Sequence, residues 1–206
     1  MFIERPPVWF RRLFPGAIFR LPSAEKGKKR VFLTFDDGPI PEATPWVLDT
    51  LDRFGVKATF FMVGQNVERH PELKEEVLRR GHIAGNHTLH HMKGMGVSKA
   101  SYMADAERGA EVTGSILFRP PHGVLTPSQL KSLKKHYKIV MYDLVTRDYS
   151  KHLSAKDVVD NVKRFARDGS IIVFHDSLKS LPRIKEALPE CLQWLIDNGY
   201  EFELLR

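Results

Sequence analysis

The chain has 206 residues and a formal net charge of +7, and its 42% hydrophobic and 28% charged residues are those of one soluble globular domain. No apolar run reaches the roughly 18 residues that a membrane-spanning helix needs. The single cysteine, Cys191, excludes an internal disulfide and a cysteine-rich zinc site, and we expect it in the core. The positive charge favours an acidic partner such as an anionic lipid or cell-wall polymer. Nucleic acid is not expected, because no nucleic-acid-binding module is recognisable.

The first 29 residues are rich in proline, aromatic residues and arginine, and we expect them to form an arm over the remaining domain, residues 30–206. Arg11 and Arg12 interrupt the apolar residues near the N-terminus, so no signal-peptide core is recognisable and a cytoplasmic location is expected. An alternative use of residues 1–20 is peripheral contact with a membrane, since arginines lie among the aromatic side chains. These aromatic residues are Trp9, Phe10, Phe14 and Phe19.

From residue 30 onward, strand and helix signals alternate without long gaps. Pro71 and Gly81 bound one predicted helix, Thr126 and Gln129 form a capping box that begins another, and Pro189 is expected to kink or split the last one. Strands are predicted at residues 31–35, 59–63, 82–84, 116–118, 138–142, 170–174 and 200–204. Helices are predicted at residues 42–54, 71–80, from 98 onward, from 126 onward, 154–167 and 181–198.

About seven strands separated by helices indicate parallel pairing, hence a doubly wound open sheet or a barrel. An open sheet would concentrate its site at one switch point, whereas a (β/α) barrel gathers side chains from many strand ends at one rim. Polar residues follow five different strands here, so the sequence predicts a single-domain α/β protein, a small distorted (β/α) barrel. These residues are Asp36, Asp37, His87, Arg119, Asp143 and His175.

Two motifs indicate a metal centre. Asp36 and Asp37 are adjacent carboxylates at a strand end, where one can bind a metal while the other handles protons; a turn capped by one of them is the simpler alternative. His87 and His91 are spaced so that both imidazoles would face one side of a helical turn, whereas His90 would point elsewhere. Two histidines and Asp37 leave positions open for water, with zinc as the default ion and non-haem iron as the alternative.

Together these motifs resemble the NodB-homology polysaccharide deacetylases, carbohydrate esterase family 4, from about residue 30 to the C-terminus. The resemblance implies that Asp36 is the general base and that Arg119 orients it. It also implies a metal site made of Asp37, His87 and His91.

Further roles are implied by the same resemblance. In the segment Arg119-Pro120-Pro121-His122-Gly123, the backbone N–H of His122 is similar to the oxyanion donor, although an aromatic Tyr or Phe is common there. In the segment Ile172-Val173-Phe174-His175, His175 resembles the general acid and Ile172 the apolar wall for the acetyl methyl group.

The sequence departs from the family pattern in the segment Val145-Thr146-Arg147-Asp148-Tyr149, where Asp-x-x-Asp-Trp is usual. Val145 removes the carboxylate expected to orient His175, so another aspartate is expected to replace it. Tyr149 replaces a tryptophan that lines the sugar groove, which alters the substrate fit. The candidate partners of His175, in order of preference, are Asp143, Asp176 and Asp148.

The resemblance implies a hydrolase that removes N-acetyl groups from an amino-sugar glycan, peptidoglycan or a chitin-like GlcNAc polymer, with one divalent ion, zinc or else cobalt or another metal. A deacetylase or deformylase of a lipid-linked or soluble amino-sugar precursor is the alternative enzyme, because such a substrate can be reached from the cytoplasm. A catalytically silent carbohydrate-binding module is the alternative from another class, and Val145 is the feature that favours it.

Overall fold

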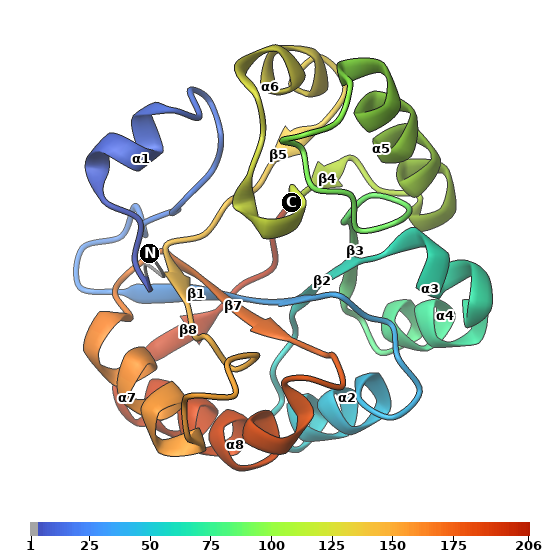
Figure 1. Cartoon of the computed structure of the whole chain (residues 1–206). Coiled ribbons are helices and arrows are strands. Elements are labelled where there is room, and N and C mark those ends of the chain that lie inside the picture. Colours follow the sequence, from blue (N-terminus) through green and yellow to red (C-terminus); the bar gives the residue numbers. More distant parts are fainter. Residues whose placement is uncertain (1–3) are drawn as a thin grey trace.

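The computed structural model describes residues 4–206 and shows a curled parallel sheet inside a ring of helices (Figure 1). The strand order is β5-β4-β3-β2-β1-β7-β6, and β8 pairs with the start of β1. All of the strand pairs are parallel, which confirms the predicted distorted (β/α) barrel. The strands are β1 (Lys29–Asp36), β2 (Thr59–Met62), β3 (Ile83–Asn86), β4 (Leu117–Phe118), β5 (Lys138–Ile139), β6 (Leu144–Val145), β7 (Ser170–His175) and β8 (Tyr200–Phe202).

The helices cover the outside of the sheet. Thr126 and Gln129 form the expected capping box at the start of α6, and α8 runs unbroken through Pro189, so the predicted split does not occur. Within residues 4–206 none of the helices is long and apolar enough to cross a membrane. The helices are α1 (Val8–Arg12), α2 (Thr44–Arg53), α3 (Gly64–Arg69), α4 (Pro71–Arg79), α5 (Lys99–Thr113), α6 (Pro127–Leu133), α7 (Ala155–Phe165) and α8 (Leu181–Asp197).

The segment predicted as one strand over residues 138–142 is a named strand only at its start, where β5 pairs with β4. Leu117 and Phe118 of β4 pair with β5, and the chain then crosses to β7, with which β6 pairs through Leu144 and Val145. Asp143 separates β6 from the predicted segment, and the two apolar residues Leu144 and Val145 are too few to give a strand pattern of their own. This crossing adds β6 to the predicted strands.

Alternation along the strands decides which side chains reach the site. In β1, Leu33 and Phe35 join the large core cluster under α2, α7 and α8, which also holds the buried Cys191 as expected. Phe32 instead lies in a smaller cluster with residues of other strands, on the inner side of the curled sheet. Because side chains alternate with a period of two, Asp36 shares the inner face with Phe32.

The N-terminal arm packs against the barrel beside β5 and β7 (Figure 1). The Ile18 N–H donates to the Ile139 carbonyl at 2.8 Å, and the Leu21 N–H donates to the Gly169 carbonyl at 2.9 Å. Phe14 and Phe19 are 6% and 7% exposed and belong to an apolar cluster with β4 and α6. The expectation that these two phenylalanines could touch a membrane is therefore wrong, because they anchor the arm.

Candidate active site

The polar residues singled out from the sequence gather where the parallel strands end. Asp36 and His175 are the last residues of the paired strands β1 and β7, and they stand opposite each other in the register. His87 and Arg119 directly follow β3 and β4. All four line one cavity of about 700 Å³.

Asp37, His87 and His91 bring one ligand atom each to within 4.8 Å of the others. The Asp37 Oδ1 lies 3.1 Å from His91 Nε2 and 3.7 Å from His87 Nε2. The predicted helical turn is wrong: residues 87–91 form a loop in which Thr88 and His91 have φ of 62° and 54°. These left-handed conformations fold the loop so that both imidazoles still reach Asp37, and such backbone strain is common at functional sites.

The protonation of this group suits a metal ion. The His87 Nδ1–H donates to the Arg119 carbonyl at 2.8 Å, which leaves Nε2 with its lone pair toward Asp37. Burial lowers the pKa of His87 to about 4, so the imidazole is neutral at neutral pH. Burial would raise the pKa of Asp37, but the hydrogen bond from His91 and the nearby histidines hold it below its usual range. Two histidine nitrogens and a carboxylate are donors that zinc takes.

Asp36 is held by the buried arginine predicted to orient it. Arg119 Nη1 donates to Asp36 Oδ1 at 2.6 Å and to Thr34 Oγ1 at 2.7 Å, and Nη2 donates to the Met141 carbonyl at 3.0 Å. Its guanidinium also lies over the Phe61 ring, 4.1 Å from the centroid. Since the guanidinium is fixed from several sides, it sets the position of the carboxylate.

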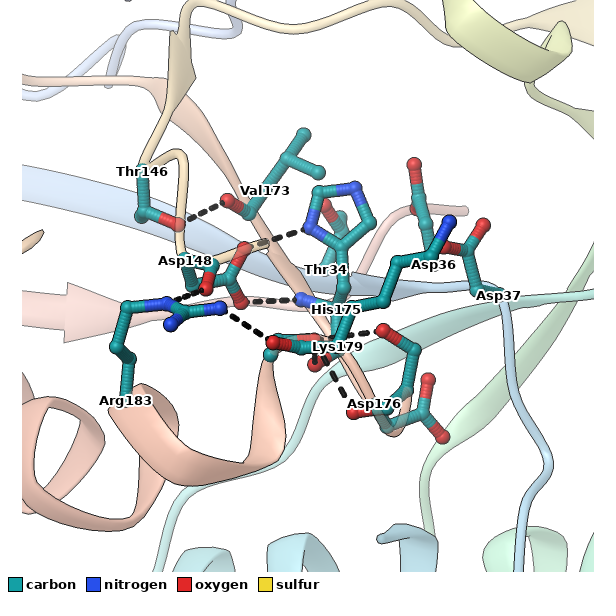
Figure 2. Close-up of polar contacts among 12 residues, drawn as sticks. Thr34, Asp36, Asp37, Thr146, Asp148, Val173, His175, Asp176, Lys179 and Arg183 are labelled. Carbon is teal, nitrogen blue, oxygen red and sulfur yellow. Dashed lines mark hydrogen bonds and ion pairs between the residues drawn. The ribbon is translucent and has the colours of Figure 1, made fainter. Parts of the chain in front are cut away.

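His175 is paired with Asp148 (Figure 2). His175 Nδ1 lies 2.7 Å from Asp148 Oδ1, and the His175 backbone N–H donates to Asp148 Oδ2 at 2.7 Å. Burial alone would lower the pKa of His175, but the Asp148 charge and hydrogen bond, with Asp37 and Asp36 nearby, raise it to about 9. Arg183 Nε in turn donates to the Asp148 carbonyl at 2.5 Å.

The predicted order of partners for His175 is therefore wrong. Asp143, the first choice, is fully buried and accepts hydrogen bonds from Arg11, Arg167 and Ser170. Asp176, the second choice, accepts from the Gly38 N–H and the Thr44 hydroxyl. Asp143 was ranked first because it directly follows a predicted strand, whereas the loop after β6 brings Asp148 to the imidazole.

The substrate-contacting residues expected from the sequence divide into two groups. Tyr149 and His122 line the cavity, and the Tyr149 ring meets the His175 ring edge to face at 4.9 Å between centroids. Ile172 does not line it: this side chain is buried in the core cluster on the helix side of the sheet. Val173 lines the cavity instead. Val173 is two residues before His175 on the same strand, and residues two apart face the same side of a sheet. The alternation along the strand could therefore have predicted Val173 as the cavity residue.

Three further cavity residues are cationic and were not predicted as site residues. Lys93 and Lys179 lie in loops after β3 and β7, and Arg147 in the loop after β6. Arg147 Nη1 binds the Glu4 carboxylate of the arm at 2.5 Å. His90, by contrast, points away from the metal triad as expected, and its Nδ1 lies 2.6 Å from Asp105.

Comparison with known proteins agrees with this site. The family model described as polysaccharide deacetylase matches residues 23–138. A peptidoglycan-N-acetylglucosamine deacetylase of Bacillus cereus is 35% identical over 191 residues, which are 87% of this chain and 89% of that protein. The peptidoglycan-N-acetylmuramic acid deacetylase PdaC of Bacillus subtilis is 31% identical, over 87% of this chain and 38% of that protein. The crystal structure of the Bc1960 peptidoglycan N-acetylglucosamine deacetylase matches this chain with a TM-score of 0.86 at 31% identity. The match covers 97% of this chain and 94% of the Bc1960 chain.

The chain therefore belongs to the polysaccharide deacetylase family. It is accordingly a carbohydrate N-deacetylase, a hydrolase that acts on an amino-sugar glycan.

Proposed function

We propose that the protein removes the N-acetyl group from GlcNAc units of peptidoglycan with the help of one divalent ion, zinc, bound by Asp37, His87 and His91. The observation that carries the proposal is the convergence of this triad with two hydrogen-bonded pairs, Asp36 with Arg119 and His175 with Asp148, at the strand ends. A base, an acid and a metal site around one cavity are the parts that amide hydrolysis requires.

The metal triad fits a zinc ion by the chemistry of its donors and by the orientation of His87, whose Nδ1 is already bonded to the Arg119 carbonyl. When bound, a divalent ion supplies Lewis acidity toward the acetyl carbonyl and lowers the pKa of water. Three protein ligands leave positions for water and substrate, as in catalytic zinc sites.

Different residues around the triad carry out the separate proton transfers of the reaction. Asp36, held by Arg119, accepts the proton of the attacking water, while the backbone N–H of His122 donates to the developing oxyanion. His175 protonates the departing amine, and its raised pKa keeps the imidazolium populated at neutral pH. Tyr149 and Val173 then bound the space for the sugar and its acetyl group. The products are acetate and a free amino sugar.

Acetate release from a substrate panel tests this function. Protein stripped by a chelator and reloaded with zinc or cobalt is given peptidoglycan strands, chitin oligomers, and lipid-linked and soluble amino-sugar precursors. We expect chelation to abolish acetate release and either metal to restore it, with peptidoglycan preferred. Full activity in metal-free protein would refute the metal assignment, and an iron requirement with oxygen consumption would move the protein to the oxygenase class.

The same panel separates the remaining alternatives. Preference for a lipid-linked or soluble precursor would keep the chemistry and change the substrate to one within reach of the cytoplasm. Binding of glycan without acetate release, in zinc-loaded protein, would favour the silent carbohydrate-binding module.

A further inference from the structure

Two lysines that the proposed reaction does not use line the same cavity as the metal triad. Lys93 and Lys179 are both exposed members of the cavity wall. Within residues 4–206 no salt bridge involves either lysine, although the wall carries two aspartates. Both ammonium groups are therefore available to a ligand that enters the cavity.

The two lysines lie in loops that follow strands which are not neighbours in the sheet. Lys93 lies in the loop after β3, two residues beyond His91, and Lys179 lies between β7 and α8. In the sheet, β2 and β1 separate β3 from β7. The Lys179 side chain extends toward the side of the site that holds Asp36 and Asp37 (Figure 2).

Among the described residues, both aspartates of the cavity wall have other partners than the two lysines. Asp36 is paired with Arg119, and Asp37 belongs to the proposed metal site. The third cationic side chain at the mouth, Arg147, is held by Glu4 of the arm. A cleft with excess positive charge attracts anionic ligands and raises their association rate.

We propose, on the basis of the deacetylase function above, that Lys93 and Lys179 form a subsite for carboxylates carried by sugars beside the acetamido sugar that is hydrolysed. The ligand class is an amino-sugar glycan in which sugars bearing a carboxylate, on a lactyl group or on an attached peptide, alternate with the reacting sugars. Lysine suits this task because its ammonium is a point charge on a flexible stem, which reaches carboxylates in varied positions. A neutral chitin-like strand offers these two ammonium groups hydrogen-bond acceptors but no negative charge to pair with.

The test compares one glycan strand in two forms, with its carboxylates free and with the same carboxylates converted to methylamides. The variants are Lys93→Gln, Lys179→Gln and the double variant, with Lys→Arg at both positions as the conservative rescue. Lys99→Gln is the matched control, because Lys99 is also exposed but begins α5 outside the cavity wall. Zinc-loaded protein is assayed for kcat and KM of acetate release at low and high salt.

We expect the wild type and Lys99→Gln to have a higher kcat/KM on the carboxylate strand than on the amidated strand. The ratio of these two values should fall roughly threefold in each single variant and about tenfold in the double variant, as for partly exposed ion pairs. The loss should lie in KM, salt should reproduce it in the wild type, and the arginine variants should restore it. An unchanged preference in the double variant, or equal losses on both strands, would overturn the proposal.

Failure of the subsite and failure of the proposed function give different results. Acetate release from the amidated strand by the wild type demonstrates the deacetylase whatever the lysines do. If neither strand releases acetate, equilibrium binding of the two strands to the wild type and the double variant still decides the subsite: equal binding of both strands by the wild type would refute it.

Discussion

At the scale of single residues, the charge state of His175 depends on one neighbour. Asp148 is fully buried and presents both carboxylate oxygens to His175, one to the ring and one to the backbone. The imidazole is itself largely buried, so without the carboxylate the neutral ring would be favoured. Asp148 thereby makes the residue able to donate a proton at neutral pH.

Replacing Asp148 by Asn should therefore move the alkaline limb of the pH–rate profile. A general acid acts in its protonated form, so activity is present below the pKa of His175, about 9 here, and is lost as the pH rises through it. Asp148→Asn removes the group that raises this pKa, so the limb shifts to lower pH and activity at neutral pH falls by roughly 10²-fold or more. The measurement is kcat/KM against pH in zinc-loaded protein.

Asp143→Asn is the control for that shift, since Asp143 binds Arg11, Arg167 and Ser170 instead. Its limb should coincide with that of the wild type. A limb that moves in Asp143→Asn and stays in place in Asp148→Asn would show that the pairing is misassigned.

At the scale of elements, the N-terminal arm is attached to the segment that carries the His175 partner. The Val145 N–H donates to the Glu4 carbonyl at 2.8 Å, and the Glu4 carboxylate binds Arg147. Farther along the arm, Arg11 Nη2 donates to the fully buried Asp143 at 2.5 Å. The arm thus fixes residues 143–147, directly ahead of Asp148.

Arg11→Met should lower the free energy of unfolding by about 1–2 kcal/mol. It removes a charged hydrogen bond from a buried carboxylate that keeps its other partners, and with it the Nε hydrogen bond to the Pro6 carbonyl and the contact with the Phe19 ring. The measurement is a urea-unfolding midpoint. Arg12→Met is the matched control on the same helix: Arg12 is exposed, and its loss should change stability by less than about 0.5 kcal/mol. Equal effects of the two changes would contradict the role given to Arg11.

The alternation of strands and helices was enough to predict the barrel, because each element carries its own period and end signals. The rim residues Asp36, His87, Arg119 and His175 were also predictable, since a residue after a parallel strand must lie at one end of the sheet. The partner of His175 was not predictable, because Asp148 reaches it through a loop whose path depends on β6 and on the distant arm. A two-residue strand such as β6 leaves no pattern of its own.

At the scale of the whole molecule, the metal triad joins segments that are distant in the sequence. Asp37 follows β1, whereas His87 and His91 follow β3, so an ion bound by the proposed triad would tie the two loops together. An ion that binds only the folded protein stabilises it by mass action, by about 2.7 kcal/mol at a concentration of 100 times its Kd.

Saturating zinc should accordingly raise the Tm of chelator-treated protein by about 5–10 °C, given roughly 2–4 °C per kcal/mol for a chain of this size. Asp37→Ala should lose this shift because it removes a ligand, whereas Asp36→Asn should keep the shift and lose turnover because it removes only the base. Differential scanning calorimetry with metal analysis measures both. Loss of the shift in both variants would show that Asp36 also binds the ion.

The course of the arm also determines how the enzyme can be joined to another polypeptide. Residue 4 lies beside Arg147 at the mouth of the site, whereas Leu205 and Arg206 line a second cavity of about 520 Å³ with Ile83 and Leu117, where β3 and β4 begin. A reporter fused ahead of the arm would emerge next to the mouth, and one fused after Arg206 would emerge at the opposite end of the strands. Surface immobilisation through the carboxyl end should therefore leave the approach of a long polymer open, while attachment through the amino end should hinder polymers more than short oligomers.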